Sequence, residues 1–166
     1  MRLKNLTDLF LYELRTMHDA ENQLLKALPQ MTDAARDAGL KKAFETHLQE
    51  TAHHVSRIGE IFDILGLDKK GEPCKAIAGL IAESREMIRD AGDDRAINAA
   101  LIASAQKIEH YEIASYGTLI ALARELGYDN AVVILKQTIE EEKTADEKLT
   151  ALAEGGINHE ALKKAA

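Results

Sequence analysis

Apolar residues recur at alternating spacings of three and four along most of the chain, a pattern typical of helices with one buried face. The pattern predicts helical segments at residues 3–36, 40–65, 74–89, 94–126 and 130–153. Gly39 and Gly127 each follow a periodic segment, as glycines at helix ends often do. Four segments are long and one is short, so we expect two antiparallel helix hairpins joined by a crossover helix.

This arrangement favours an all-α fold, a ferritin-like four-helix bundle with an additional short crossover helix. The length of 166 residues fits a single domain over residues 1–166. A content of 46% hydrophobic and 30% charged residues excludes a disordered chain. Only 2 prolines and 10 glycines disfavour a β-sandwich, which needs many turns.

The chain has 28 acidic and 21 basic residues, which gives a formal net charge of −7. This balance argues against nucleic acid as a partner, because binding phosphates requires clustered Lys and Arg. No apolar run reaches the roughly 20 residues that cross a membrane, and the N-terminal residues do not resemble a signal peptide. With Cys74 as the single cysteine, a cytoplasmic location is expected.

A single acid interrupts the apolar stripe of the first segment. The stripe consists of Phe10, Leu14, Met17, Glu21, Leu24, Leu28, Met31 and Ala35. An unpaired carboxylate in a protein core is strongly unfavourable. Glu21 must therefore be neutralised by a hydrogen bond, an ion pair or a metal ion.

The last segment carries two acids, Glu142 and Asp146, in the middle of its apolar face. Carboxylates four residues apart repel each other, so the burial of both is hard to explain without a cation. The neighbouring Glu140, Glu141 and Glu147 lie on other faces and are expected in solvent.

In the segment at 94–126, Glu112 lies beside the apolar stripe that contains Ile108 and Ser115, whereas Glu109 lies further round the helix. We therefore expect Glu112 to enter the core in preference to Glu109. A charged helix edge is the alternative interpretation for each residue. Tyr111 is expected to hydrogen-bond nearby and could serve as an oxidisable neighbour.

The segment at 40–65 contains three of the protein's 6 histidines within a few turns. His47 and His54 fall closest to the apolar face, with Glu50 at its edge and His53 further away. Two assignments remain open: the Glu-x-x-His pair of Glu50 and His53, or Glu50 with His47 and His54. The better helical phase favours the second.

Each long helix thus places one or two carboxylates near its middle, and the second adds imidazole. Di-iron and di-manganese bundles follow a similar plan, in which two helices supply one Glu each and two supply Glu-x-x-His pairs. Glu21 and Glu112 would fill the single-Glu positions. Oxygen ligands with one or two imidazoles suit iron or manganese better than zinc, so we expect two iron or manganese ions per chain.

Several short sequence stretches, spread over nearly the whole chain, together form a pattern that can be compared with known families. They are Leu9-Phe10, Ala20-Glu21 with Gln23-Leu24, His47 to Thr51, Ala105 to Thr118, and Glu140 to Leu149. The stretch from Ala105 to Thr118 is the most specific. Together they resemble the bacterial ferritin-like stress-protein family typified by YciF and YciE.

The resemblance implies a ferritin-like bundle with an added short helix, an internal di-metal centre and a homodimer instead of a storage cage. By position, it implies metal ligation by Glu21, Glu50, Glu112, Glu142 and Asp146, with His47 as the imidazole source. His54 is a further candidate ligand from its helical phase. Rubrerythrin-like relatives carry Glu-x-x-His on the last helix, whereas here Ala145 is the third residue after Glu142.

These features favour a stress-response protein whose metal pair reduces a small oxidant such as peroxide or dioxygen. The alternative is a non-enzymatic structural or interaction protein in which the metal site only stabilises the bundle. Iron storage has less support, because the acids cluster in one layer and do not line a channel.

Overall fold

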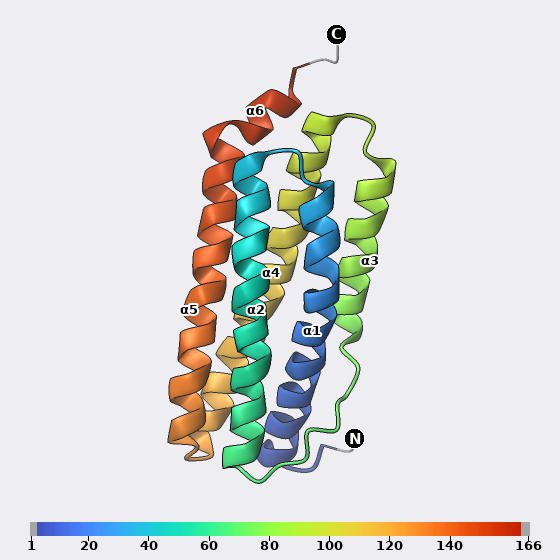
Figure 1. Cartoon of the computed structure of the whole chain (residues 1–166). Coiled ribbons are helices and arrows are strands. Elements are labelled where there is room, and N and C mark those ends of the chain that lie inside the picture. Colours follow the sequence, from blue (N-terminus) through green and yellow to red (C-terminus); the bar gives the residue numbers. More distant parts are fainter. Residues whose placement is uncertain (1–2, 164–166) are drawn as a thin grey trace.

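The computed structural model describes residues 3–163, in which every regular element is helical (Figure 1). Four long helices lie side by side: α1 (Leu6–Ala34), α2 (Ala38–Ile64), α4 (Asp94–Glu125) and α5 (Asp129–Leu152). The shorter α3 (Lys75–Asp90) packs outside them, against α1 and α4. After α5, a helical turn, η1 (Ala153–Ile157), leads into α6 (Asn158–Ala161) across one end of the bundle.

The chain forms two helix hairpins, α1 with α2 and α4 with α5, and the hairpins meet through α2–α5 and α1–α4 contacts. Between them, α3 carries the chain back along the bundle, so that α2 and α4 run in the same direction (Figure 1). This connection is the single crossover expected of a ferritin-like bundle. The predicted all-α bundle with a short crossover helix is therefore confirmed.

Side chains that cap the helices fix where α2 and α4 begin. Asp37 accepts a hydrogen bond from the backbone N–H of Leu40 at 2.8 Å, and Asp93 caps α4 in the same way. The Oδ1 atom of Asn98 in α4 accepts from the backbone N–H groups of Arg36 and Asp37, which fastens the α1–α2 turn to the second hairpin. Gly39, expected between the helices, lies in the first turn of α2, because Asp37 caps that helix two residues earlier.

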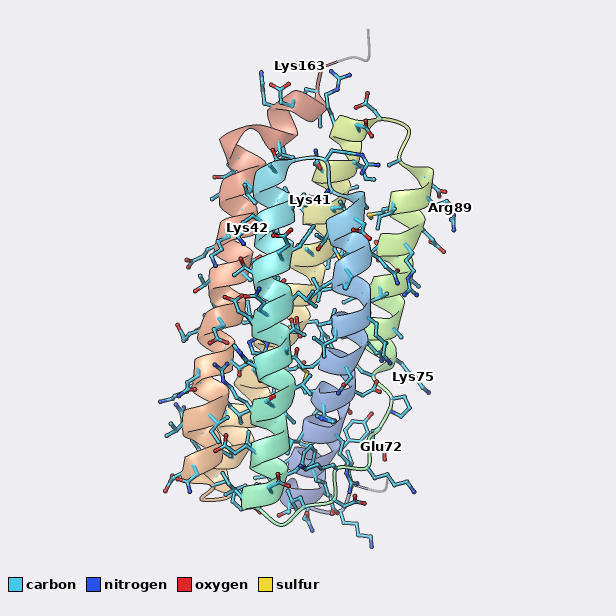
Figure 2. All side chains as sticks on the ribbon, viewed as in Figure 1. Lys41, Lys42, Glu72, Lys75, Arg89 and Lys163 are labelled. Carbon is cyan, nitrogen blue, oxygen red and sulfur yellow. The ribbon has the colours of Figure 1, made fainter. Side chains whose placement is uncertain are left out.

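Each long helix turns an apolar face inward, and Phe10, Leu14, Phe62, Leu101 and Leu119 are almost completely buried. Charged side chains labelled in Figure 2, such as Lys42 and Arg89, point away from the bundle. No helix of residues 3–163 combines the length and apolarity needed to span a membrane. The buried Glu and His side chains of the described residues gather in one layer near the middle of the long helices.

Candidate metal centre

Six buried polar residues from all four long helices meet in this layer. They are Glu21 on α1, His47 and His54 on α2, Glu109 and Glu112 on α4, and Glu142 on α5, and we call them the Glu/His cluster. None is more than 5% exposed. Helical phase carries them inward: Glu21, for example, lies one turn from the buried Met17 and Leu24.

The cluster consists of two overlapping groups of candidate ligands. One group is formed by His47, Glu109, Glu112 and Glu142, and the other by Glu21, His54 and Glu142. Within each group, every residue offers one ligand atom, and these atoms lie within 4.8 Å of one another. Glu142 belongs to both groups, so its carboxylate stands between them.

Most of the side-chain nitrogen and oxygen atoms in the cluster lack hydrogen-bond partners. Among the described residues, the buried side-chain nitrogen and oxygen atoms without a hydrogen bond all belong to the cluster, except Ser84 Oγ. Both oxygens of Glu112 and both oxygens of Glu142 are among them. His47 Nδ1, His54 Nδ1 and the Glu142 oxygens lie within ion-pair distance of a neighbour, whereas Glu21 Oε2, Glu109 Oε2 and both Glu112 oxygens do not. Because each buried polar atom without a partner destabilises a folded protein by about 1–3 kcal/mol, the arrangement of these carboxyl groups is unfavourable for the protein alone. The donor atoms therefore fit bound cations.

The imidazole of His54 connects the cluster with the surface. Its Nδ1 atom lies 2.9 Å from Glu142 Oε1 and 3.5 Å from Glu21 Oε1. Its Nε2 atom points the other way, 2.8 Å from Glu141 Oε2. Arg57 donates two hydrogen bonds to the carboxylate of Glu141, one of them at 2.9 Å from Nη2. Glu141 therefore does not lie free in solvent as expected, because α2 presents both His54 and Arg57 to it.

His47 has a similar arrangement with its ring nitrogens exchanged. Its Nε2 atom lies 3.4 Å from Glu109 Oε1 and 3.7 Å from Glu142 Oε2. Its Nδ1 atom lies 3.5 Å from Glu50 Oε2, which is on the outer side. Each histidine thus turns one nitrogen toward the cluster and the other toward a partly exposed glutamate.

Opposing effects set the protonation of these groups. Burial lowers the pKa of both histidines, but nearby carboxylates outweigh it and raise the pKa of His47 to about 9 and that of His54 to about 11. Burial raises the pKa of Glu21, Glu109 and Glu112 above the ordinary value. Burial acts in the same direction on Glu142, yet the two histidines beside it bring its pKa below the ordinary value. The metal-free cluster therefore holds protons that bound cations would displace.

Tyr116 is a neighbour of the cluster that the sequence analysis missed. It is fully buried, and its hydroxyl donates a hydrogen bond to Glu21 Oε1. Its position four residues after Glu112, on the same helix face, could have revealed it. Tyr111, which was expected near the acids, instead lies outside the cluster with its hydroxyl 3.1 Å from Cys74 Sγ.

Glu112 is buried as expected, but Glu109 is buried as well, so the expected preference between the two residues does not hold. The buried face of α4 extends round the helix to Glu109, which lies against His47 of α2 and Glu142 of α5. The same buried face of α4 includes Glu112 and Tyr116, and Ser115 lies beside it.

Two predicted site residues lie at the edge of the bundle. The side chain of Asp146 is 20% exposed; its Oδ1 accepts from Gln106 Nε2 at 3.1 Å, and its Oδ2 lies 3.4 Å from His110 Nε2. The stripe of α5 continues through Ala145 and not through Asp146, which corrects the prediction of a buried Asp146. The Glu50 side chain is 24% exposed. Neither carboxylate belongs to the two ligand groups.

Of the two histidine assignments, the one with His47 and His54 agrees with the structure. His47 and His54 face the interior, as their helical phase predicted. His53 is exposed, so the literal Glu-x-x-His pair does not point into the bundle.

Comparisons with known proteins relate the chain to proteins of similar size. Residues 5–162 match the model of a family described as a domain of unknown function, DUF892. Protein YciF of Escherichia coli strain K12 is 44% identical over 166 residues, which are 99% of this chain and all of YciF.

Solved structures show the same fold. The E. coli stress protein YciF superposes with a TM-score of 0.90, over 94% of this chain and 99% of YciF. A Rhodopseudomonas palustris protein described as a putative structural protein is 43% identical, with a TM-score of 0.87 over 89% of this chain and 94% of its own. A Xanthomonas campestris protein shares the fold at a TM-score of 0.67 and 19% identity. The chain therefore belongs to the DUF892 family, to which the sequence resemblance to YciF pointed.

Proposed function

We propose that this chain is a cytoplasmic stress-response protein that binds two iron or manganese ions in the Glu/His cluster and uses them to reduce peroxide or dioxygen. The observation that carries this proposal is the concentration of buried nitrogen and oxygen atoms without hydrogen bonds in the cluster. Buried carboxylates are stable when they are protonated, paired or bound to cations. The similarity to the E. coli stress protein supports the stress context.

The two ligand groups suggest how the ions would be held. One ion would bind to His47, Glu109, Glu112 and Glu142, and the other to Glu21, His54 and Glu142. Glu142 would bridge them, as carboxylates do in two-metal sites. Sites rich in oxygen with one imidazole per ion suit iron or manganese, whereas structural zinc sites usually contain more nitrogen and sulfur.

When bound, the ions would supply the electrons and the positive charge that reduction of an O–O bond requires. The chain's own residues would orient the ions and keep bulk water out, since the neighbouring turns carry buried apolar side chains such as Met17 and Leu24. Tyr116 holds a proton on its hydroxyl beside Glu21. Burial raises the pKa of Tyr116 well above the ordinary value, which keeps that proton in place.

A structural role is the second candidate function. The R. palustris relative is described as a putative structural protein, and a metal site can stabilise a fold without turnover. In that case, the ions would only neutralise the buried carboxylates. The two functions differ in whether the loaded protein consumes an oxidant.

We further propose a homodimer, as the family resemblance implies. The large exposed apolar side chains among the described residues are Leu3, Leu6, Ile64, Val133 and Leu162. All except Leu162 belong to segments at the end of the bundle where α1 begins, α2 ends and α5 begins (Figure 1). In such a dimer, the second copy would cover apolar side chains at this end of the bundle.

Peroxide consumption by the iron-loaded protein tests the proposed function. We expect the wild-type protein to consume peroxide and Glu21→Ala to do so at least about tenfold more slowly. Glu140→Ala is the matched control, because Glu140 is 69% exposed and pairs with Lys143 outside the cluster. Equal rates for the wild type and Glu21→Ala would contradict the enzymatic proposal and leave the structural one.

A further inference from the structure

A small cavity between α2 and α5 reaches the Glu/His cluster from the side. Its volume is about 10 Å³, roughly the space that one water molecule needs. The lining residues are Ala43, Phe44, His47, Glu50, Glu109, Ala145, Lys148 and Leu149. Because His47 and Glu109 belong to the cluster, a molecule in this cavity would contact the first ligand group directly.

The cavity has an apolar wall and a polar rim. Phe44, Ala145 and Leu149 are buried and form the wall. At the rim, Lys148 is exposed and Glu50 is partly exposed, so the cavity joins the cluster to the surface. Larger cavities, near Asp94 and beside Cys74, contain no residue of the cluster.

Ala145 accounts for the space in this cavity. It lies three residues after Glu142, at the position where di-iron carboxylate bundles carry the histidine of a Glu-x-x-His pair. An alanine there presents a methyl group in place of an imidazole, and it leaves room beside His47 and Glu109. An ion in the first group would have one protein ligand fewer on this side. Metal sites that bind exogenous ligands keep such a position open.

We infer that this cavity is the binding position of a small exogenous ligand, of one or two non-hydrogen atoms, on the ion held by His47, Glu109, Glu112 and Glu142. The inference rests on the proposed function and deepens it, because it selects one of the two ions and limits the size of the substrate. Dioxygen and hydrogen peroxide have the required size. A branched organic hydroperoxide is too large for a cavity of about 10 Å³.

Nitric oxide is a suitable diatomic probe, since its N–O stretching band reports binding to ferrous iron without turnover. We expect the iron-loaded wild-type protein to show this band. Ala145→Leu fills the cavity from α5, and Ala43→Leu fills it from α2 at a partly exposed position that tolerates a larger side chain. Both variants should retain the iron content of the wild type, while the band weakens by about tenfold or more.

Ala151→Leu is the matched control, because it makes the same change at an exposed position of α5 away from the cavity. This variant should keep the full band. A band of undiminished intensity in iron-loaded Ala43→Leu or Ala145→Leu would overturn the inference, as would an iron-loaded wild type without the band. A wild-type protein that takes up no iron or manganese would instead overturn the proposed function.

Discussion

The Nε2 atom of His54 lies 2.8 Å from the Oε2 atom of Glu141, where the buried cluster meets the surface between α2 and α5. A histidine that donates from Nε2 to a carboxylate keeps the lone pair on Nδ1. In His54, Nδ1 is the atom that faces Glu142 and Glu21. Glu141, held by Arg57, therefore fixes both the ring orientation and the tautomer that metal binding requires.

We predict that Glu141→Ala weakens the affinity of the cluster for metal by about 10- to 100-fold, because His54 loses the partner that orients it. Glu141→Gln should weaken it less, since the amide oxygen can still accept from Nε2–H. Competition with a chelator of known affinity measures the effect. Glu140→Ala, next in the chain and solvent-exposed, should bind metal as the wild type does. Unchanged affinity in Glu141→Ala would disprove the orienting role.

Glu142 and Glu109 should affect metal content differently. Glu142 belongs to both ligand groups and Glu109 to only one. Glu142→Ala should therefore lose both ions, whereas Glu109→Ala should keep about one ion per chain, bound by Glu21, His54 and Glu142. Elemental analysis of the purified variants gives the two contents. The same metal content in both variants would refute the proposal that the two ions share the Glu142 carboxylate.

Removal of metal should make stability depend on pH in the alkaline range. The folded metal-free protein has a pKa of about 9 at His47 and about 11 at His54, against an ordinary value of 6.5. A raised pKa means that the folded state binds the proton more tightly than the unfolded state. The stabilisation is therefore complete below about pH 6.5 and is lost as the pH rises through 9 and towards 11.

Thermal unfolding in the presence of a chelator measures this loss. The melting temperature of the metal-free wild type should fall as the pH rises above 6.5, and His47→Gln should show a smaller fall up to about pH 9. The metal-loaded protein should change less, because cations replace the protons. A metal-free melting temperature that rises over this range would contradict the assignment of protons to the cluster.

Tyr116→Phe should destabilise the metal-free protein more than the loaded one. The change removes the hydroxyl that donates to Glu21 Oε1, and this oxygen is left with the 3.5 Å contact to His54 Nδ1 while Oε2 has no partner. We expect a loss of about 1–3 kcal/mol in the free energy of unfolding without metal, and a smaller loss with metal bound to Glu21. Tyr111→Phe is the control, since its hydroxyl meets Cys74 outside the cluster. Denaturant unfolding with and without metal compares the two variants.

The fold could be predicted because hydrophobic periodicity determines where each long helix lies and which face it buries. The predicted start of a helical segment at residue 94 agrees with α4, which Asp93 caps. Glu21 and Glu142 were identified because each interrupts an apolar stripe. In the structure, both side chains are fully buried. An acid within such a stripe is visible in the sequence without knowledge of the partner helices.

The missed residues depend on contacts between helices, which periodicity does not contain. Glu109 is buried because His47 of α2 and Glu142 of α5 lie against it. Glu141 is held by Arg57 and His54 of α2, so its position depends on how α2 meets α5. Asp146 was placed in the core because it follows Glu142 by four residues, but Ala145 and Leu149 fill that part of the interior.

Anomalous diffraction from crystals loaded with iron or manganese would show whether the Glu/His cluster holds two ions. We expect two peaks per chain, about 3.5–4 Å apart, on either side of the Glu142 carboxylate. One peak should lie beside His47 and Glu109, and the other beside Glu21 and His54. Metal found only at exposed carboxylates, with no peak in the Glu/His cluster, would contradict a metal centre in this cluster.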